Sequence, residues 1–164
     1  MLRVLLTIIL GLLVKANIVH AEDSAFLHES AVNWEMNEFP VHRWKTLVGN
    51  GVEDRTSPDD IYMGTWELAP NAVYHGHKHE TPEIYYVLSG KALWTVGEES
   101  KEVIAGTAIY TRPGANHKMV NLTDEPVKAI WIWWAPNGNR KVFESEYIFT
   151  EEAPVQADNV GFNN

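Results

Sequence analysis

The sequence contains no cysteine, so neither disulfides nor thiolate metal sites can form. Stability must come from a hydrophobic core, to which 7 Trp, 6 Tyr and 5 Phe contribute large apolar side chains. Basic residues are also few: 13 Lys and Arg against 22 Asp and Glu give a formal net charge of −9 at pH 7. Such a chain repels nucleic acid and anionic lipid surfaces, so we expect neither as a partner.

Long hydrophobic runs are missing as well. The apolar N-terminal run, Val4–Val14, follows Arg3 and stops at Lys15, and it falls short of the roughly 20 residues that a transmembrane helix needs. Together with small residues before a cleavage point after Ala21, this pattern is typical of a secretory signal peptide. An uncleaved N-terminal anchor is the alternative. We therefore expect residues 1–21 to be removed and the protein to be periplasmic or secreted, without stable membrane insertion.

The rest of the chain shows no useful helical period, no internal repeat and no second domain. From Arg43 onward, short apolar runs alternate with turn residues such as Ser89-Gly90, where we expect a tight turn between two strands. About ten short strands of this kind predict an all-β fold, an antiparallel β-barrel or jelly roll. The run 127–135 is so apolar that we expect a strand buried on both faces. The expected organisation after the signal peptide is an N-terminal arm (22–42), the barrel (43–150) and a polar tail (151–164).

Three of the seven histidines occupy alternate positions: His75, His77 and His79. Because residues i and i+2 of a strand point to the same face, we expect these three side chains to share one face. Glu83 and Tyr85 alternate in the same way in the following run, and pairing of the two strands would bring imidazoles and a carboxylate together inside the barrel. A metal-free cluster is the alternative, but buried ionisable groups without an ion are costly. Imidazole with carboxylate suits Fe, Mn, Ni or Zn.

These residues fall in a recognisable pattern. The first part reads His77-x-His79-x3-Glu83-x6-Gly90 and resembles the first motif of the cupin superfamily, spacing included. A second motif of that superfamily is recognisable in Gly106, Pro113-Gly114, His117 and Asn121. In the family one residue usually separates the proline from the glycine, whereas here they are adjacent, and either arrangement can make the turn. The resemblance covers residues 43–150.

The resemblance implies a fold, a cofactor and a ligand set. The fold is a single-domain, RmlC-like cupin barrel, and the cofactor is one divalent metal ion. The implied metal ligands are His77, His79, Glu83 and His117. His75 lies outside this set, and we expect it at the barrel mouth. Barrels of this family often pair edge strands, which implies that two copies can form a homodimer.

Within the superfamily, the pattern His-x-His-x3-Glu-x-Tyr with a later His resembles the small cupin lyases that cleave dimethylsulfoniopropionate to acrylate and dimethyl sulfide. This resemblance implies that the metal anchors a substrate carboxylate and that Tyr85 acts as the base. The sulfonium group then leaves by β-elimination. Aromatic faces attract such a cation, so we expect Tyr110 and Trp133 to line the substrate pocket.

Other functions stay open. An Fe(II)-dependent dioxygenase would use the same four ligands and would need no protein base. A non-catalytic cupin would bind a small molecule without turnover. A sugar isomerase or epimerase would need further polar side chains at the mouth, for which His75, Lys78 and Arg112 are the candidates. We do not expect a transcriptional regulator, since no helical DNA-binding segment or basic patch accompanies the barrel.

Overall fold

The computed structural model describes residues 26–37, 40–49, 60–151 and 162. The predicted signal peptide, residues 1–21, lies outside the described residues, as does most of the predicted tail, residues 151–164. Across the part of the chain that is described, no helix is both long enough and apolar enough to cross a membrane.

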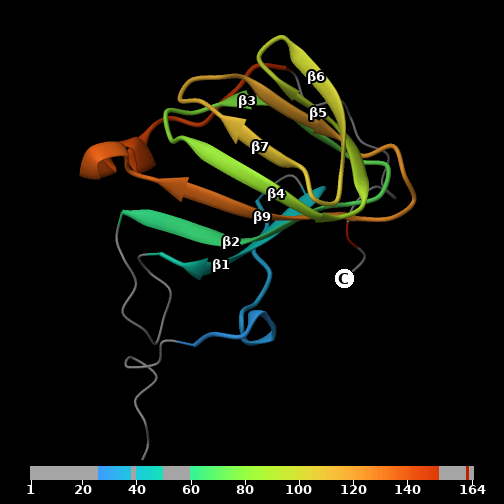
Figure 1. Ribbon diagram of the computed structural model, residues 1–164, viewed down its shortest axis with the longest axis horizontal. Helices are drawn as coiled ribbons and strands as arrows, with labels where there is room; N and C mark the ends of the chain where they lie inside the picture. The colour runs from blue at the N-terminus through green and yellow to red at the C-terminus, as the bar shows by residue number, and fades with distance from the viewer. Residues whose placement is uncertain (1–25, 38–39, 50–59, 152–161, 163–164) are drawn as a thin grey trace, which may run out of the picture.

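The described residues form two antiparallel five-stranded sheets that face each other (Figure 1). The strand orders are β1-β2-β9-β4-β7 and β10-β3-β8-β5-β6. The strands are β1 (His42–Val48), β2 (Ile61–Leu68), β3 (Val73–Lys78), β4 (Glu83–Ser89), β5 (Lys91–Val96), β6 (Glu99–Ile104), β7 (Ala108–Thr111), β8 (His117–Val120), β9 (Val127–Trp134) and β10 (Ile148–Phe149), and the short 3-10 helices are η1 (Glu29–Ala31), η2 (Pro136–Gly138) and η3 (Arg140–Glu144). The predicted all-β jelly roll is confirmed.

Strand β4 shows the alternation that orients the site. Glu83, Tyr85 and Val87 are buried, whereas Tyr86 and Leu88 between and beyond them are exposed. This is the pattern of a strand with one face on the core and one on solvent. The carboxylate of Glu83 and the phenol of Tyr85 therefore both point into the barrel.

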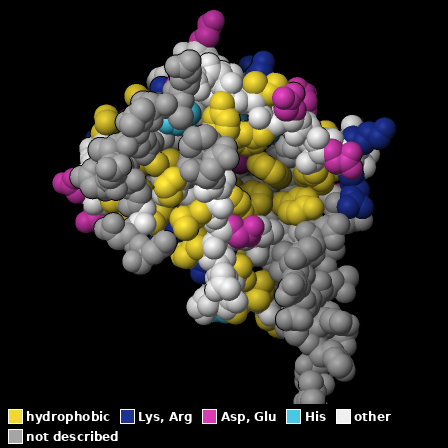
Figure 2. Space-filling model, turned by 180° about the vertical axis from the view of Figure 1, so that it is seen from behind, with side chains coloured by type: hydrophobic (Ala, Val, Ile, Leu, Met, Phe, Trp, Pro, Cys, Tyr) yellow, Lys and Arg dark blue, Asp and Glu magenta, His cyan; other side chains and the backbone are white. Residues whose placement is uncertain are grey.

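The prediction for 127–135, a strand buried on both faces, is wrong. In β9 the side chains of Val127, Ala129 and Trp131 are buried, but the intervening residues are only half-buried. Strand β9 lies in the middle of its sheet, between β2 and β4, and the outer face of that sheet is not covered by the second sheet. Exposed hydrophobic side chains occur elsewhere too: Figure 2, which views the molecule from behind Figure 1, shows hydrophobic side chains at the surface beside acidic ones.

The predicted tight turn at Ser89-Gly90 lies between two strands, β4 and β5, but it joins the two sheets and does not form a hairpin. Strand β4 before it pairs with β7 and β9, whereas β5 after it pairs with β6 and β8. Gly90 has φ of 79°, and a Cβ atom there would lie 2.6 Å from the carbonyl oxygen of Pro126. Glycine is therefore required at this corner, both for its conformation and for the close approach of the chain.

Residues 26–37 run beside β1 on the outer side of its sheet, below the barrel in Figure 1. Glu35 and Trp44 form an isolated antiparallel bridge, and Lys45 Nζ donates to the carbonyl oxygen of Glu29 at 3.0 Å. Lys128 of β9 forms an ion pair of 2.8 Å with the carboxylate of Glu29. These contacts hold the described part of the N-terminal arm against the barrel.

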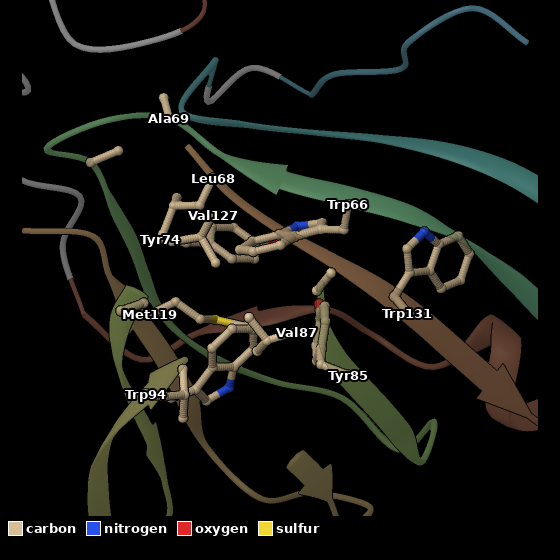
Figure 3. Close-up of a cluster of buried hydrophobic side chains, with 14 of the residues drawn as sticks. Trp66, Leu68, Ala69, Tyr74, Tyr85, Val87, Trp94, Met119, Val127 and Trp131 are labelled. Carbon is tan, nitrogen blue, oxygen red and sulfur yellow. The ribbon is translucent and has the colours of Figure 1, made fainter. Parts of the chain in front are cut away.

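The hydrophobic core fills the space between the sheets (Figure 3). Leu68 of β2, Val87 of β4 and Met119 of β8 have no exposed surface. Trp66 of β2 and Trp94 of β5 approach to 5.7 Å between ring centroids, so aromatic side chains of both sheets meet there. The core thus ties together the strands that carry the candidate site.

We expect Leu68→Ala to lower the free energy of unfolding by about 2–5 kcal/mol, because it removes buried carbon atoms and leaves a cavity. The matched control is Leu88→Ala on β4, whose side chain is 41% exposed. That variant should change the free energy of unfolding by less than about 0.5 kcal/mol. Urea unfolding followed by tryptophan fluorescence measures both, and equal losses would contradict the core assignment of Leu68.

Candidate metal centre and cavity

Three histidines meet inside the barrel. His77 of β3 and His117 of β8 are direct partners across the two strands, and His79 follows the end of β3. All three are buried, and one ring nitrogen of each lies within 4.8 Å of one ring nitrogen of the other two. The structure therefore brings the three predicted histidines together.

Each of these imidazoles is oriented by a backbone carbonyl oxygen two residues away. The Nδ1 atom lies at 2.7 Å from that oxygen in His77, 2.8 Å in His79 and 3.1 Å in His117. A carbonyl oxygen only accepts, so each Nδ1 carries the proton and each Nε2 is left with its lone pair. This is the arrangement that metal-binding histidines have in proteins.

Glu83 supplies an oxygen to the same cluster. Its Oε2 atom lies 3.2 Å from His117 Nε2 and 3.6 Å from His79 Nε2, and among the described residues these three buried atoms have no hydrogen-bond partner. The lone pairs of the two Nε2 atoms repel the carboxylate oxygen that they face unless a cation lies between them. Ligand atoms about 2.1 Å from one ion lie roughly 3–3.5 Å apart, so the spacing fits a metal ion.

Burial and charge favour the metal-binding protonation states. Burial first, and then the charge of His117, lower the pKa of His77 to about 2. Burial raises the pKa of Glu83, but the neighbouring His117 and His79 rings outweigh it and bring that pKa below its usual value. At neutral pH His77 is therefore neutral and Glu83 is ionised, as metal binding requires.

As predicted, His75 is not part of the cluster, but the expectation that it shares a face with His77 is wrong. A β-bulge shifts the register of β3 between Tyr74 and His77, so Tyr74 and not His75 shares the inner face with His77. The rings of Tyr74 and His77 lie 4.5 Å apart. His75 is buried near Glu151 and Lys118, where burial lowers its pKa.

The histidine strand and the glutamate strand do not pair, yet their side chains still converge. Strand β3 belongs to one sheet and β4 to the other, so Glu83 reaches the histidines across the interior of the barrel. The predicted ligand set is thus held by both sheets at once.

A cavity of about 420 Å³ adjoins the cluster, and Glu83 belongs to both. Among the described residues that line it, none is Lys or Arg and most are aromatic. The lining residues are Asn37, His42, Trp44, Thr46, Tyr62, Trp66, Tyr74, Glu83, Tyr85, Trp131, Trp133, Phe143 and Tyr147. The volume suits a small-molecule ligand.

Comparison with known proteins identifies the fold family. Residues 64–133, from β2 to β9, match the model of the Cupin domain. Residues 64–133 therefore form a cupin domain. Dimethylsulfoniopropionate lyase DddW of Ruegeria pomeroyi is 36% identical over 78 residues, which cover 48% of this chain and 49% of the relative. Uncharacterized protein MJ1618 of Methanocaldococcus jannaschii is 41% identical over 61 residues, covering 37% and 49%. The chain spans about half the length of these two curated relatives.

Solved structures share the cupin fold. The polyketide cyclase RemF of Streptomyces resistomycificus has a TM-score of 0.64 at 19% identity, covering 80% of this chain and 89% of RemF. The dimethylsulfoniopropionate lyase DddQ of Ruegeria pomeroyi has a TM-score of 0.60 at 18% identity, covering 74% and 62%. Because the two neighbours have different activities, fold alone does not fix the reaction of this cupin domain.

Two of the three other predicted site residues line the cavity of the cupin domain. Tyr85 packs against Trp66 and Trp94, and Trp133 lies 5.2 Å from His79 between ring centroids. Tyr110 does not line it: on β7 it points outward, is 52% exposed and stacks on Trp134. The prediction that Tyr110 lines the pocket is wrong, because its neighbour Thr111 takes the inward position opposite Glu83.

Burial raises the pKa of Tyr85 well above its usual value, and the negative charge of Glu83 raises it further. A cation bound beside the phenol would act in the opposite direction. Deprotonation of Tyr85 would therefore require a positive charge at the histidine cluster.

Sequence reasoning missed several residues of the cavity. His42 and Trp44 share one face of β1, and Tyr62 and Trp66 share one face of β2, so strand alternation groups each pair without showing that its face turns inward. Tyr147 lies in no alternating pattern of this kind in the sequence. Its ring stacks on His77 at 4.6 Å, and its hydroxyl bonds to the hydroxyl of Tyr74.

Proposed function

We propose that this protein is a metal-dependent lyase that acts on a small carboxylate of the dimethylsulfoniopropionate type. The observation that carries the proposal is the aromatic cavity, with no Lys or Arg among its described lining residues, that meets a buried cluster of three histidines at Glu83. The identity of 36% to the lyase DddW over 78 residues supports the same substrate class.

The proposed metal ligands are His77, His79, Glu83 and His117, held by the contacts described above. When bound, a divalent ion supplies Lewis acidity to a substrate carboxylate and positive charge that favours ionisation of a nearby phenol. Several metals suit three imidazoles and one carboxylate, and availability decides among them.

The cavity walls suit a cationic group. Indole and phenol faces each attract a cation by about 0.5–2 kcal/mol, and Trp131, Trp133 and Tyr62 all present such faces. The described lining residues include no Lys or Arg, so they do not repel a cation and would bind a dianion only weakly. A zwitterion matches this site, because its carboxylate suits the proposed metal centre and its sulfonium suits the aromatic walls.

Tyr85 is the proposed base. Its side chain lines the cavity two residues after Glu83 and on the same face of β4. The phenolate oxygen takes the proton from the carbon next to the carboxylate, and that electron pair forms the carbon–carbon double bond. The carbon–sulfur bond breaks and its electron pair leaves with dimethyl sulfide, so acrylate remains.

The test is turnover of dimethylsulfoniopropionate by the purified protein, with metal removed by chelation and then restored. We expect dimethyl sulfide in the headspace and acrylate in solution, in equal amounts, only after metal is restored and without oxygen uptake. Oxygen uptake with a carboxylate substrate would contradict the proposal and favour a dioxygenase. Ligand binding without any product would indicate a non-catalytic cupin.

A further inference from the structure

His42 is a buried histidine of the cavity that the candidate metal centre does not use. It begins β1, is 3% exposed, and lies against Tyr74 at 3.9 Å and Trp44 at 5.5 Å between ring centroids. Tyr74 in turn contacts His77. His42 therefore lies one aromatic ring away from the histidine cluster.

The position of the proton on His42 follows from one hydrogen bond. Trp66 Nε1 donates to His42 Nδ1 at 3.3 Å. An indole nitrogen only donates, so Nδ1 of His42 holds a lone pair. Burial lowers the pKa of His42 to about 4, although the charge of Glu83 acts in the opposite direction, so the ring is neutral. A neutral ring whose Nδ1 accepts carries its proton on Nε2.

This Nε2–H donor has no hydrogen-bond partner among the residues that the structure describes. Buried donors are nearly always paired in native proteins, so an acceptor is missing. The lining of the cavity supplies aromatic faces, and its indole nitrogens of Trp131 and Trp133 are further donors in the same unpaired state. The cavity therefore suits a ligand that carries a hydrogen-bond acceptor.

We propose that His42 is a substrate-binding residue whose Nε2–H donates to a carboxylate oxygen of the substrate. The proposal rests on the function proposed above, because a sulfonium carboxylate has acceptor atoms only in its carboxylate. Aromatic walls hold the cationic end, and the hydrogen bond to His42 fixes the anionic end. Such a bond is strengthened by the charge of the acceptor.

The test compares wild type with His42→Phe and His42→Gln in the metal-loaded protein. Phenylalanine keeps the ring shape without the donor, whereas the side-chain amide of glutamine can restore an N–H group near the position of Nε2. Calorimetric titration with propionate, which cannot be cleaved, should show a dissociation constant raised roughly 10–100-fold in His42→Phe and close to wild type in His42→Gln. With dimethylsulfoniopropionate, His42→Phe should raise KM more than it lowers kcat.

The failures of the two proposals are distinguishable. If wild type binds propionate and His42→Phe binds it equally well, the role of His42 is overturned and the proposed function stands. If metal-loaded wild type binds no carboxylate, the proposed function fails and the role of His42 fails with it. Nitrogen NMR of zinc-loaded protein with labelled histidine gives a measurement that does not depend on variant folding. It should show His42 protonated on Nε2, and protonation on Nδ1 would overturn the inference.

Discussion

Tyr85→Phe should lower kcat for dimethylsulfoniopropionate cleavage by about 10²–10⁴-fold, the usual contribution of a general base. The substitution removes one oxygen atom and keeps the ring that packs against Trp66 and Trp94. Metal content and melting temperature should therefore stay close to those of wild type. Headspace dimethyl sulfide, measured under saturating substrate, gives the rate.

Tyr110→Phe is the matched control for this variant. Tyr110 is half exposed on the outer face of β7, so the loss of its hydroxyl should leave kcat within about twofold of wild type. A Tyr85→Phe protein that retains nearly full activity would contradict the role of Tyr85 as base. Tyr147, whose phenol ring stacks on His77 and His79, would then be the candidate for the base.

His117→Ala should remove the bound metal and abolish turnover. His117 Nε2 is fully buried and lies closest to the carboxylate of Glu83, so no solvent-exposed group can take its place. Loss of a partner that only supports a ligand already weakens metal binding by about 10–100-fold, and loss of a direct ligand should exceed that. Elemental analysis should find about one metal per chain in wild type and little in the variant.

His75→Ala is the control for the histidine series. His75 is two residues from His77, yet its side chain lies outside the cluster, and the carbonyl oxygen that orients His77 belongs to its backbone. This variant should therefore keep about one metal per chain. Metal retained by His117→Ala, or lost from His75→Ala alone, would contradict the proposed ligand set.

The sequence could predict the cluster because its members lie in short motifs. His77, His79 and Glu83 are close along the chain, and the structure brings them together with His117 as the motif implies. The path of the backbone between them could not be predicted. Nothing in the local pattern distinguishes a bulge in β3 from a regular strand, and this bulge decides that His75 faces away from the cluster.

The cavity was harder to predict than the cluster. Alternation shows which residues of one strand share a face, but not which face turns inward. Tyr110 and Trp133 were both candidates, and only the pairing of β4 with β7 and β9 separates them. Tyr147 follows η3, outside any regular strand, so its contact with His77 depends on tertiary packing alone.

The most direct measurement is anomalous diffraction from crystals of the metal-loaded protein, recorded at the absorption edge of the metal. We predict one strong peak per chain, about 2.0–2.2 Å from Nε2 of each of the three histidines and from an oxygen of Glu83. No peak at this position in crystals soaked with excess metal, or a peak elsewhere on the molecule, would contradict a metal centre built from His77, His79, Glu83 and His117.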